Sequence, residues 1–220
     1  MKLSVLGATG QTGQFLVRQA LEQGHMVTAI VRTPSKLTVQ HDNLKVVEAN
    51  IFSEDSLVEH FKEQDAVLSC LGFPLSIFSR ATGYTDSMKA VVVAMRQAKV
   101  NRMITMTSWY TKPESARKAS LFVQYLVVPV IHNLLINMDE MENYLSEQCD
   151  DLNWTAVKPP GLRNGPATDK EILTNDGYFV PGPDGNPLGD SVSRGDVARF
   201  MLSLLNGDLW MKKAVAMTTK

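Results

Sequence analysis

The sequence predicts an α/β fold, a single Rossmann-like, doubly wound parallel sheet with helices on both faces and a small loop-rich region near the C-terminus. Two observations lead to it. Short apolar runs rich in β-forming residues alternate with stretches of helical spacing. A glycine-rich turn directly follows the first run. Alternating strands and helices are typical of a parallel sheet that is covered on both faces.

The expected elements follow in chain order. Helical spacing covers Gln11–Gln23 and Thr82–Ala98, whereas the polar stretch Thr33–Asn43 predicts a crossover without a full helix. Beyond Lys158, dense proline and glycine predict turns, until Ser193 begins a helix as its N-cap. The expected strands are Leu3–Leu6, Val27–Val31, Leu44–Val47, Ala66–Leu71, Met103–Met106, Trp154–Val157 and Ala214–Met217.

Composition sets further limits. With 44% hydrophobic and 20% charged residues, the 220-residue chain has ordinary globular composition, and we expect one domain over residues 1–220. A net charge of −1 does not favour nucleic acid. Cys70 and Cys149 lack metal-ligand spacing, so we expect buried free thiols and no metal site. The first apolar run is too short for a signal peptide, and we expect a reducing, cytoplasmic setting.

The glycine-rich turn has the spacing GxxGxxG and opens the first helix. Gly7 permits a tight turn, Gly10 lets backbone approach a pyrophosphate, and Gly13 lets the helix pack closely on the sheet. The alternative is a turn that uses glycine only for its backbone freedom. The expected contacts with a dinucleotide are Gly7, Thr9, Gly10, Gln11, Thr12 and Gly13.

The second strand runs into cations where an NAD site usually places a carboxylate. Arg32 and Lys36, with the hydroxyl of Ser35, suit a 2′-phosphate, so we expect NADP(H) rather than NAD(H). The alternative is that these cations are solvated loop residues. After the fourth strand, Leu71 and Gly72 offer backbone to the same cofactor.

Several motifs occur along the chain: Gly7–Gly13, Val31-Arg32, Asp65–Val67, Leu71-Gly72, Met106–Ser108, Pro159-Pro160 and Ser193–Ala198. Taken together, these motifs resemble the atypical short-chain dehydrogenases, in particular the NmrA-like NAD(P)H-binding proteins and the flavin reductase (NADPH)/biliverdin-IXβ reductase group. The resemblance implies an NADPH-dependent reductase of conjugated acceptors that works as a monomer, with Thr107, Ser108 and Pro159 near the nicotinamide. Asn50 replaces an aspartate that relatives use to contact adenine, and Glu142 aligns with a histidine near the substrate.

The chain lacks the Tyr-xxx-Lys pair of ordinary short-chain dehydrogenases, because no tyrosine has lysine four places later. A flat conjugated acceptor such as flavin, quinone or tetrapyrrole needs less acid catalysis, so positioning dominates. Ser108 is the candidate catalytic hydroxyl; the alternative is a cap or turn serine. Residues expected to contact the acceptor are Phe73, Trp109, Tyr110, Pro160 and Leu162.

Residues 121–136 form the least usual segment. Pro129 and interspersed polar residues make it too short and too broken to span a bilayer, so we expect no transmembrane segment. We expect a helix broken at Pro129 and packed on the core, with His132 a core or interface histidine rather than a proton donor. A cap over the acceptor site, a membrane contact, or a dimer contact through 121–136 remain open.

The sequence thus favours an NADPH-dependent reductase of a conjugated acceptor. The alternative is a non-catalytic NADP(H)-binding redox sensor that acts through a protein partner, which also needs no Tyr-xxx-Lys pair. Reduction or isomerisation of a small carbonyl compound with a displaced acid ranks below both.

Overall fold

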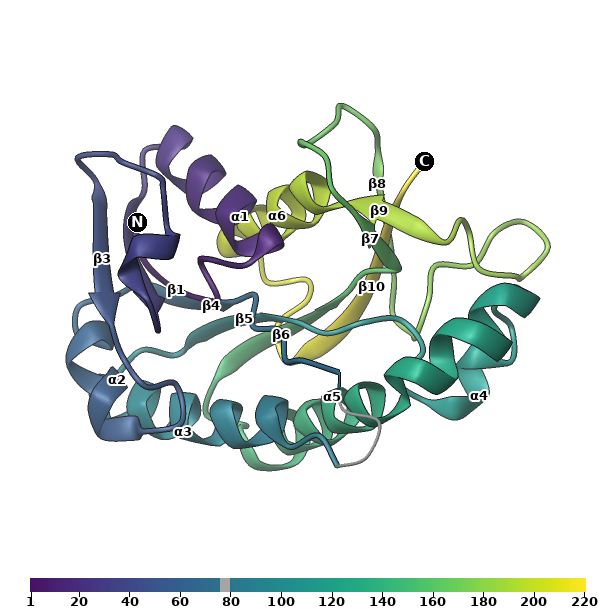
Figure 1. Ribbon diagram of the computed structural model, residues 1–220, viewed down its shortest axis with the longest axis horizontal. Coiled ribbons are helices and arrows are strands. Elements are labelled where there is room, and N and C mark those ends of the chain that lie inside the picture. Colours follow the sequence, from purple (N-terminus) through teal and green to yellow (C-terminus); the bar gives the residue numbers. More distant parts are fainter. Residues whose placement is uncertain (76–79) are drawn as a thin grey trace.

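An eight-stranded, mostly parallel sheet forms the centre of the protein (Figure 1). The computed structural model describes residues 1–75 and 80–220. The strand order is β3-β2-β1-β4-β5-β6-β10-β8, in which β8 alone runs antiparallel to its neighbour. The predicted Rossmann-like fold is confirmed. The strands are β1 (Lys2–Leu6), β2 (Met26–Val31), β3 (Leu44–Glu48), β4 (Ala66–Ser69), β5 (Arg102–Met106), β6 (Asn153–Lys158), β8 (Ile172–Asn175) and β10 (Lys213–Thr219).

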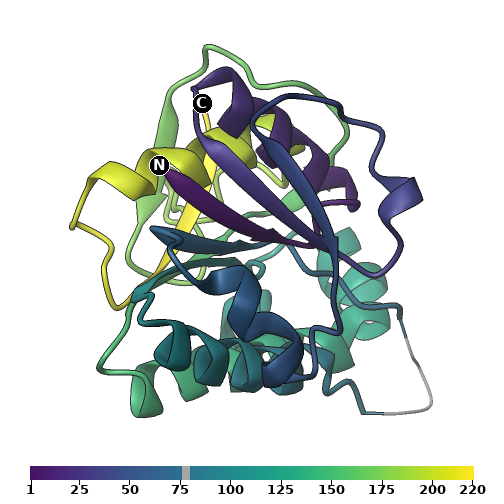
Figure 2. The same ribbon diagram turned by 90° about the vertical axis from the view of Figure 1, so that its left-hand side faces the viewer.

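Helices cover both faces of this sheet (Figure 2). Helices α1 and α6 pack together on one face, whereas α3 packs between α2 and α5 on the other. As predicted, the crossover from β2 to β3 holds only a 3₁₀ turn, η1 (Pro34–Lys36). The helices are α1 (Gln11–Glu22), α2 (Glu54–Phe61), α3 (Gly83–Ala98), α4 (Pro113–Ala116), η2 (Val123–Val127), α5 (Val128–Gln148), α6 (Arg194–Ser203) and η3 (Leu204–Asn206).

Alternation along the strands builds two apolar layers. In β1, Leu3 and Val5 face α1 and pack with Leu16, while Leu6 faces the opposite layer and packs with Leu57. Both cysteines are buried free thiols, as expected. Because both faces of the sheet are covered, its carboxyl edge is the natural place for a ligand.

The region after β6 contains more strand than the sequence predicts. Strand β8 extends the sheet, and β7 (Gly161–Arg163) pairs with β9 (Ser191–Ser193). Strands of three or four residues leave too little periodicity to stand out among the prolines and glycines. The predicted N-cap is confirmed, since Ser193 Oγ accepts a hydrogen bond from the Asp196 N–H at 3.3 Å.

Segment 121–136 differs from the expectation. The helix is not broken at Pro129, because Pro129 lies in the first turn of α5, where a missing N–H is tolerated. The preceding turn, η2, is π-helical. Nor does the segment pack fully on the core, since Leu121 and His132 are exposed. In the described parts of the chain, no helix has both the length and the apolar character that a bilayer crossing requires.

We predict that Gly13→Ala destabilises the fold. A Cβ at Gly13 would lie 2.1 Å from the backbone oxygen of Gly7, so the first loop would have to shift. We expect the free energy of unfolding, measured in urea, to fall by about 2–3 kcal/mol. The control is Gly207→Ala, where a Cβ would meet open space. Equal stability of the two variants would show that the loop is not constrained by this contact.

Candidate functional site

The first loop, residues 7–10, packs tightly between β1, β4 and α1 at the carboxyl edge of the sheet. Gly7 has φ +74°, and a Cβ there would lie 2.6 Å from the carbonyl oxygen of Cys70. A Cβ at Gly13 would clash with the Gly7 oxygen. Packing of the protein therefore accounts for glycine at both positions.

Gly10 and Gly72 are glycines that packing does not account for in the same way. Gly10 has an ordinary φ of −71°, and the nearest atom to a Cβ there would be the Gly7 oxygen, at 3.1 Å. At Gly72 nothing lies within 4 Å. Both residues are exposed, one after β1 and the other just after β4, where the strand order reverses. Absence of side chains at this point leaves backbone open to a ligand.

Helix α1 begins at this opening. In the described structure no side chain caps its N-terminus, and its first turn contains no acidic residue. The first N–H groups of the helix therefore point to the carboxyl edge of the sheet. No side chain neutralises the positive end of the helix dipole there. Of the predicted contacts here, Gln11 is exposed, Thr9 is half-buried and Thr12 is buried.

The predicted phosphate and adenine contacts lie on neighbouring strand ends. Arg32, Ser35 and Lys36 are exposed after β2. Asn50 follows β3. It lies near the residues that follow β2, because the N–H of Ala49 donates a hydrogen bond to the Val31 oxygen at 3.1 Å. The Asn50 Oδ1 accepts a hydrogen bond from the next turn, from the N–H of Phe52. Its amide nitrogen is the group that remains for a ligand.

On the other side of the point where the strand order reverses, a buried hydrogen bond and a buried ion pair together connect β5, β6 and α5. The Thr107 hydroxyl donates to Glu142 Oε1 at 2.6 Å, and Glu142 Oε2 pairs with Lys158 Nζ at 2.8 Å. The ammonium group lies 4.3 Å from the ring centroid of Tyr178. Burial raises the pKa of Glu142, and the Lys158 charge and the two hydrogen bonds oppose that rise.

These two interactions hold together the ends of β5 and β6 next to Ser108. The backbone N–H of Thr107 bonds to the Val157 oxygen at 2.8 Å, and that of Trp109 bonds to the Pro159 oxygen at 2.9 Å. The β5–β6 pairing therefore continues past β5, with Ser108 between its last two rungs. The hydroxyl and the backbone N–H of Thr107 are both bonded within the protein, so its backbone carbonyl is the group that could contact a cofactor.

Sequence reasoning missed Lys158 and Tyr178 and gave Glu142 no role. A signal was present, because Lys158 is the one charged residue of a strand that is otherwise uncharged and mostly buried. A charge at such a position is buried only when it is paired.

Ser108 faces a cavity of about 320 Å³. The structure brings it together there with the predicted residues Tyr110 and Pro160. The opposite wall comes from the segment before and at the start of α5, so one of the open alternatives, a cap over this site, fits the geometry. That wall consists of Phe122, Val123, Val127, Val128 and Ile131.

Tyr110 is the polar aromatic group of this cavity. Its φ is +63°, a strained conformation for a residue with a side chain, and such strain tends to occur at functional sites. Burial, with the nearby charge of Asp190, raises the pKa of Tyr110 to about 12. The phenol is therefore a neutral hydrogen-bond donor near pH 7.

Of the other three predicted acceptor contacts, Trp109 borders this cavity, whereas Phe73 and Leu162 lie elsewhere. Trp109 is 0% exposed, with its ring against Tyr110 and Phe179, so it can only form the wall behind the cavity. Phe73 packs edge-on against Tyr84, with ring centroids 4.8 Å apart, and does not line this cavity. Leu162 packs on the core beneath α1 and α6.

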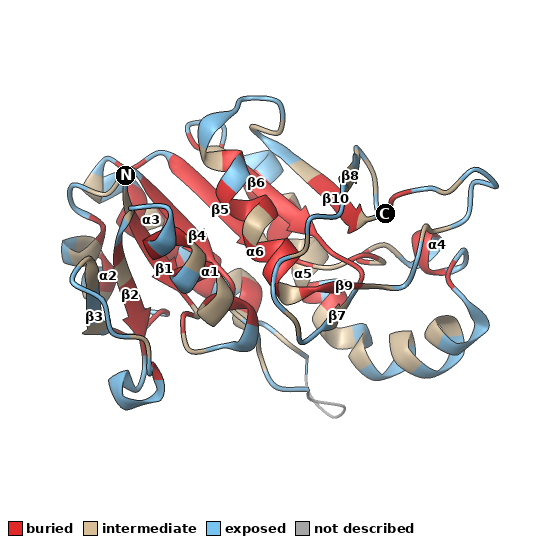
Figure 3. Cartoon of the chain, turned by 90° about the horizontal axis from the view of Figure 1, so that it is seen from above, coloured by how far each residue is buried: buried red, intermediate tan, exposed pale blue. Residues whose placement is uncertain are grey.

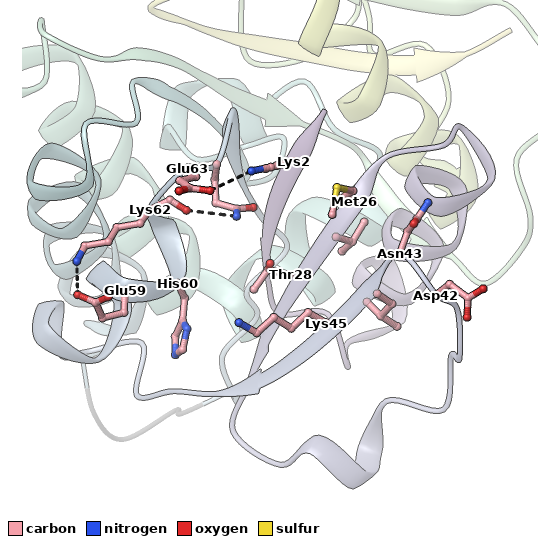
Figure 4. Close-up of a pocket in the computed structure, with 13 residues that line it drawn as sticks. Lys2, Met26, Thr28, Asp42, Asn43, Lys45, Glu59, His60, Lys62 and Glu63 are labelled. Atoms are coloured by element: carbon pink, nitrogen blue, oxygen red, sulfur yellow. Dashed lines mark hydrogen bonds and ion pairs between the residues drawn. The ribbon is translucent and has the colours of Figure 1, made fainter.

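A second cavity, also about 320 Å³, lies at the opposite edge of the sheet (Figure 4). It is bordered by the first residues of β1, β2 and β3 and by the end of α2. Lys2 pairs there with Glu63, and Lys62 with Glu59. None of the predicted site residues borders it.

Comparison with known proteins identifies the family of the chain. The model of the NAD(P)H-binding family matches residues 7–208. An uncharacterized chloroplastic protein of Arabidopsis thaliana is 28% identical over 211 residues, which are 93% of this chain and 71% of that protein.

Two solved structures share the fold. A Streptococcus pneumoniae protein provisionally assigned as an NADH-flavin reductase has a TM-score of 0.75 at 21% identity, with 100% of both chains covered. A Veillonella parvula short-chain dehydrogenase/reductase in complex with NADP also has a TM-score of 0.75, at 16% identity, and the alignment covers 99% of this chain and 94% of that one.

We predict that Lys158→Met is strongly destabilising, because it leaves the buried Glu142 carboxylate without its partner. Removing one member of a buried ion pair typically costs about 3–5 kcal/mol. The double variant Lys158→Met/Glu142→Gln should recover most of that loss, since no charge is then stranded. Urea unfolding of the two single variants and the double variant gives the coupling. Additive effects would contradict the pairing.

Proposed function

The chain belongs to the NAD(P)H-binding family, and we propose that it uses NADPH to reduce a flat conjugated acceptor such as a flavin, a quinone or a tetrapyrrole. One observation carries the proposal. A largely apolar cavity that Ser108 borders opens at the same sheet edge as the two exposed glycines, Gly10 and Gly72. A cofactor on one side and an acceptor on the other could therefore meet at Ser108.

The cofactor half of the proposal rests on charge and access. Residues 1–220 would form one cofactor-binding domain, with the pyrophosphate at the N-terminus of α1 and Gly10 leaving room for it. Arg32 and Lys36 supply positive charge for a 2′-phosphate, and Ser35 a hydroxyl. The other proposed contacts are Gly7, Thr9, Gln11, Thr12, Gly13, Asn50, Leu71, Gly72, Thr107 and Pro159.

The acceptor half rests on the residues that face the cavity. When bound, NADPH supplies the hydride. Ser108 and Tyr110 would each donate a hydrogen bond to the acceptor and so orient it. Because the pKa of Tyr110 is raised, the phenol stays protonated at neutral pH and cannot act as a base. Pro160 and the apolar wall exclude water and favour a planar ring.

We predict that Arg32→Asp weakens NADPH binding about ten- to a hundredfold and changes NADH binding little, because a charge-assisted contact to the 2′-phosphate is lost. Isothermal titration of both cofactors measures the difference. Lys99→Asp makes the same charge change at an exposed residue at the other edge of the sheet, and it should bind both cofactors as the native protein does. A parallel loss for NADPH and NADH would remove Arg32 from the site.

A second prediction tests turnover. Absorbance at the nicotinamide band should fall when a flavin or quinone is added to the protein with NADPH. Ser108→Ala should slow this reaction about five- to two-hundredfold, since one orienting hydrogen bond contributes about 1–3 kcal/mol to the barrier. Cofactor affinity should barely change. Ser203→Ala, an exposed helix serine, is the matched control.

The outcomes separate the candidate functions. A loss approaching about 10⁴-fold would indicate that Ser108 belongs to an obligatory proton-transfer system. Tight NADPH binding with no turnover on any acceptor would contradict the reductase and favour the redox sensor. A nearly silent Ser108→Ala would shift the role to Tyr110 or to solvent.

A further inference from the structure

The ten residues 121–130 expose an apolar surface that we call the outer face. It comprises Leu121, Phe122, Tyr125, Leu126 and Val130, which are 74%, 64%, 67%, 61% and 50% exposed, and also the exposed Pro129. In the rest of the described chain, large exposed apolar side chains are scattered, as is usual on a protein surface. Contiguous exposure of this kind marks an interaction site.

The helix that carries the outer face is apolar on both sides. Its inner side chains, including Val127, Val128 and Ile131, line the cavity next to Ser108. A surface helix normally turns polar residues to water, whereas the exposed residues of 121–130 are all apolar or aromatic. It lies with α4 at the end of the molecule remote from β3 (Figure 1), and much of it is coloured exposed or intermediate in Figure 3.

Within its own segment of the chain, the outer face has charges of one sign only, although Asp190 borders the cavities next to Leu121 and Phe122. From Ser115 to Met138 the sequence contains no aspartate or glutamate, although the chain has 23 acidic residues among 220. Arg117 and Lys118 directly precede the outer face and are exposed. Across the described residues, neither of them forms an ion pair with a carboxylate. This combination complements a negatively charged surface.

The size of the outer face argues against a second copy of the chain. The outer face consists of six exposed side chains on about 15 Å of helix. A stable protein contact engages about 20–30 residues and buries about 800 Å² on each partner. A narrow apolar ridge with flanking cations is instead typical of helices that lie in the surface of a bilayer.

We propose that the outer face docks the protein reversibly on an anionic membrane surface, with Arg117 and Lys118 against lipid headgroups. The apolar side chains enter the boundary between headgroups and acyl chains. The cavity beside Ser108 then lies directly behind the docked helix. An acceptor with an apolar tail could reach it from the bilayer, a consequence that rests on the proposed function.

The test is flotation of the full chain with vesicles of phosphatidylcholine alone or with about 30% phosphatidylserine. We expect binding to the anionic vesicles and much weaker binding to the neutral ones. Leu121→Gln/Leu126→Gln and Arg117→Glu/Lys118→Glu should each weaken it about tenfold or more. The control is Leu209→Gln, because Leu209 is also 74% exposed but lies in another region.

Two results would overturn the proposal. One is absence of flotation by the native protein; if light scattering then shows a dimer that Leu121→Gln/Leu126→Gln dissociates, the outer face is a contact between copies. The other is equal flotation of the paired variants and of Leu209→Gln. Thermal unfolding by circular dichroism verifies that each variant is folded. NADPH oxidation by a water-soluble quinone without vesicles tests the reductase separately, so failure of one does not mimic failure of the other.

Discussion

The close approach of the first loop to β4 is the constraint on which the site depends. Gly7 lies against the Cys70 carbonyl and Gly13 lies against Gly7, so β1, β4 and α1 can meet only if neither residue has a side chain. The contact places the start of α1 over the point where the strand order reverses. Everything proposed for a dinucleotide follows from that placement, because the helix N-terminus and the strand ends are then next to each other.

The glycines of this edge serve two different ends. At Gly7 and Gly13 a side chain would collide with backbone, so the fold itself demands glycine. At Gly10 and Gly72 the backbone is exposed; a Cβ would meet nothing within 4 Å at Gly72 and would make only one tight contact, 3.1 Å from the Gly7 oxygen, at Gly10. A sequence pattern treats all four alike. In the structure, Gly7 and Gly13 allow the loop to pack, whereas Gly10 and Gly72 are exposed. The two exposed glycines support the proposal of a ligand at this edge.

The sequence predicts the parallel strands and the glycine turn well, because apolar runs and glycine spacing are local properties. It does not predict which way a side chain points, or which residues far apart in the sequence form a pair. Ser108, Trp109 and Tyr110 are consecutive and all border the cavity, but Ser108 and Tyr110 are partly exposed while the indole between them is fully buried and forms only the wall behind it. Likewise Glu142 and Lys158 are far apart in the chain, and only the packing of α5 on the sheet makes them an ion pair.

The π-helical turn explains how one helix can serve two surfaces. Exposed residues recur in pairs four apart, at 121–122, 125–126 and 129–130. In a regular α-helix of 3.6 residues per turn, such a repeat would drift by about 40° each time around the axis. The wider i to i+5 bonding of Val123–Val127 offsets this drift. It keeps the outer face in line and leaves Val127, Val128 and Ile131 towards the cavity, so anything that moves this helix also changes the wall opposite Ser108.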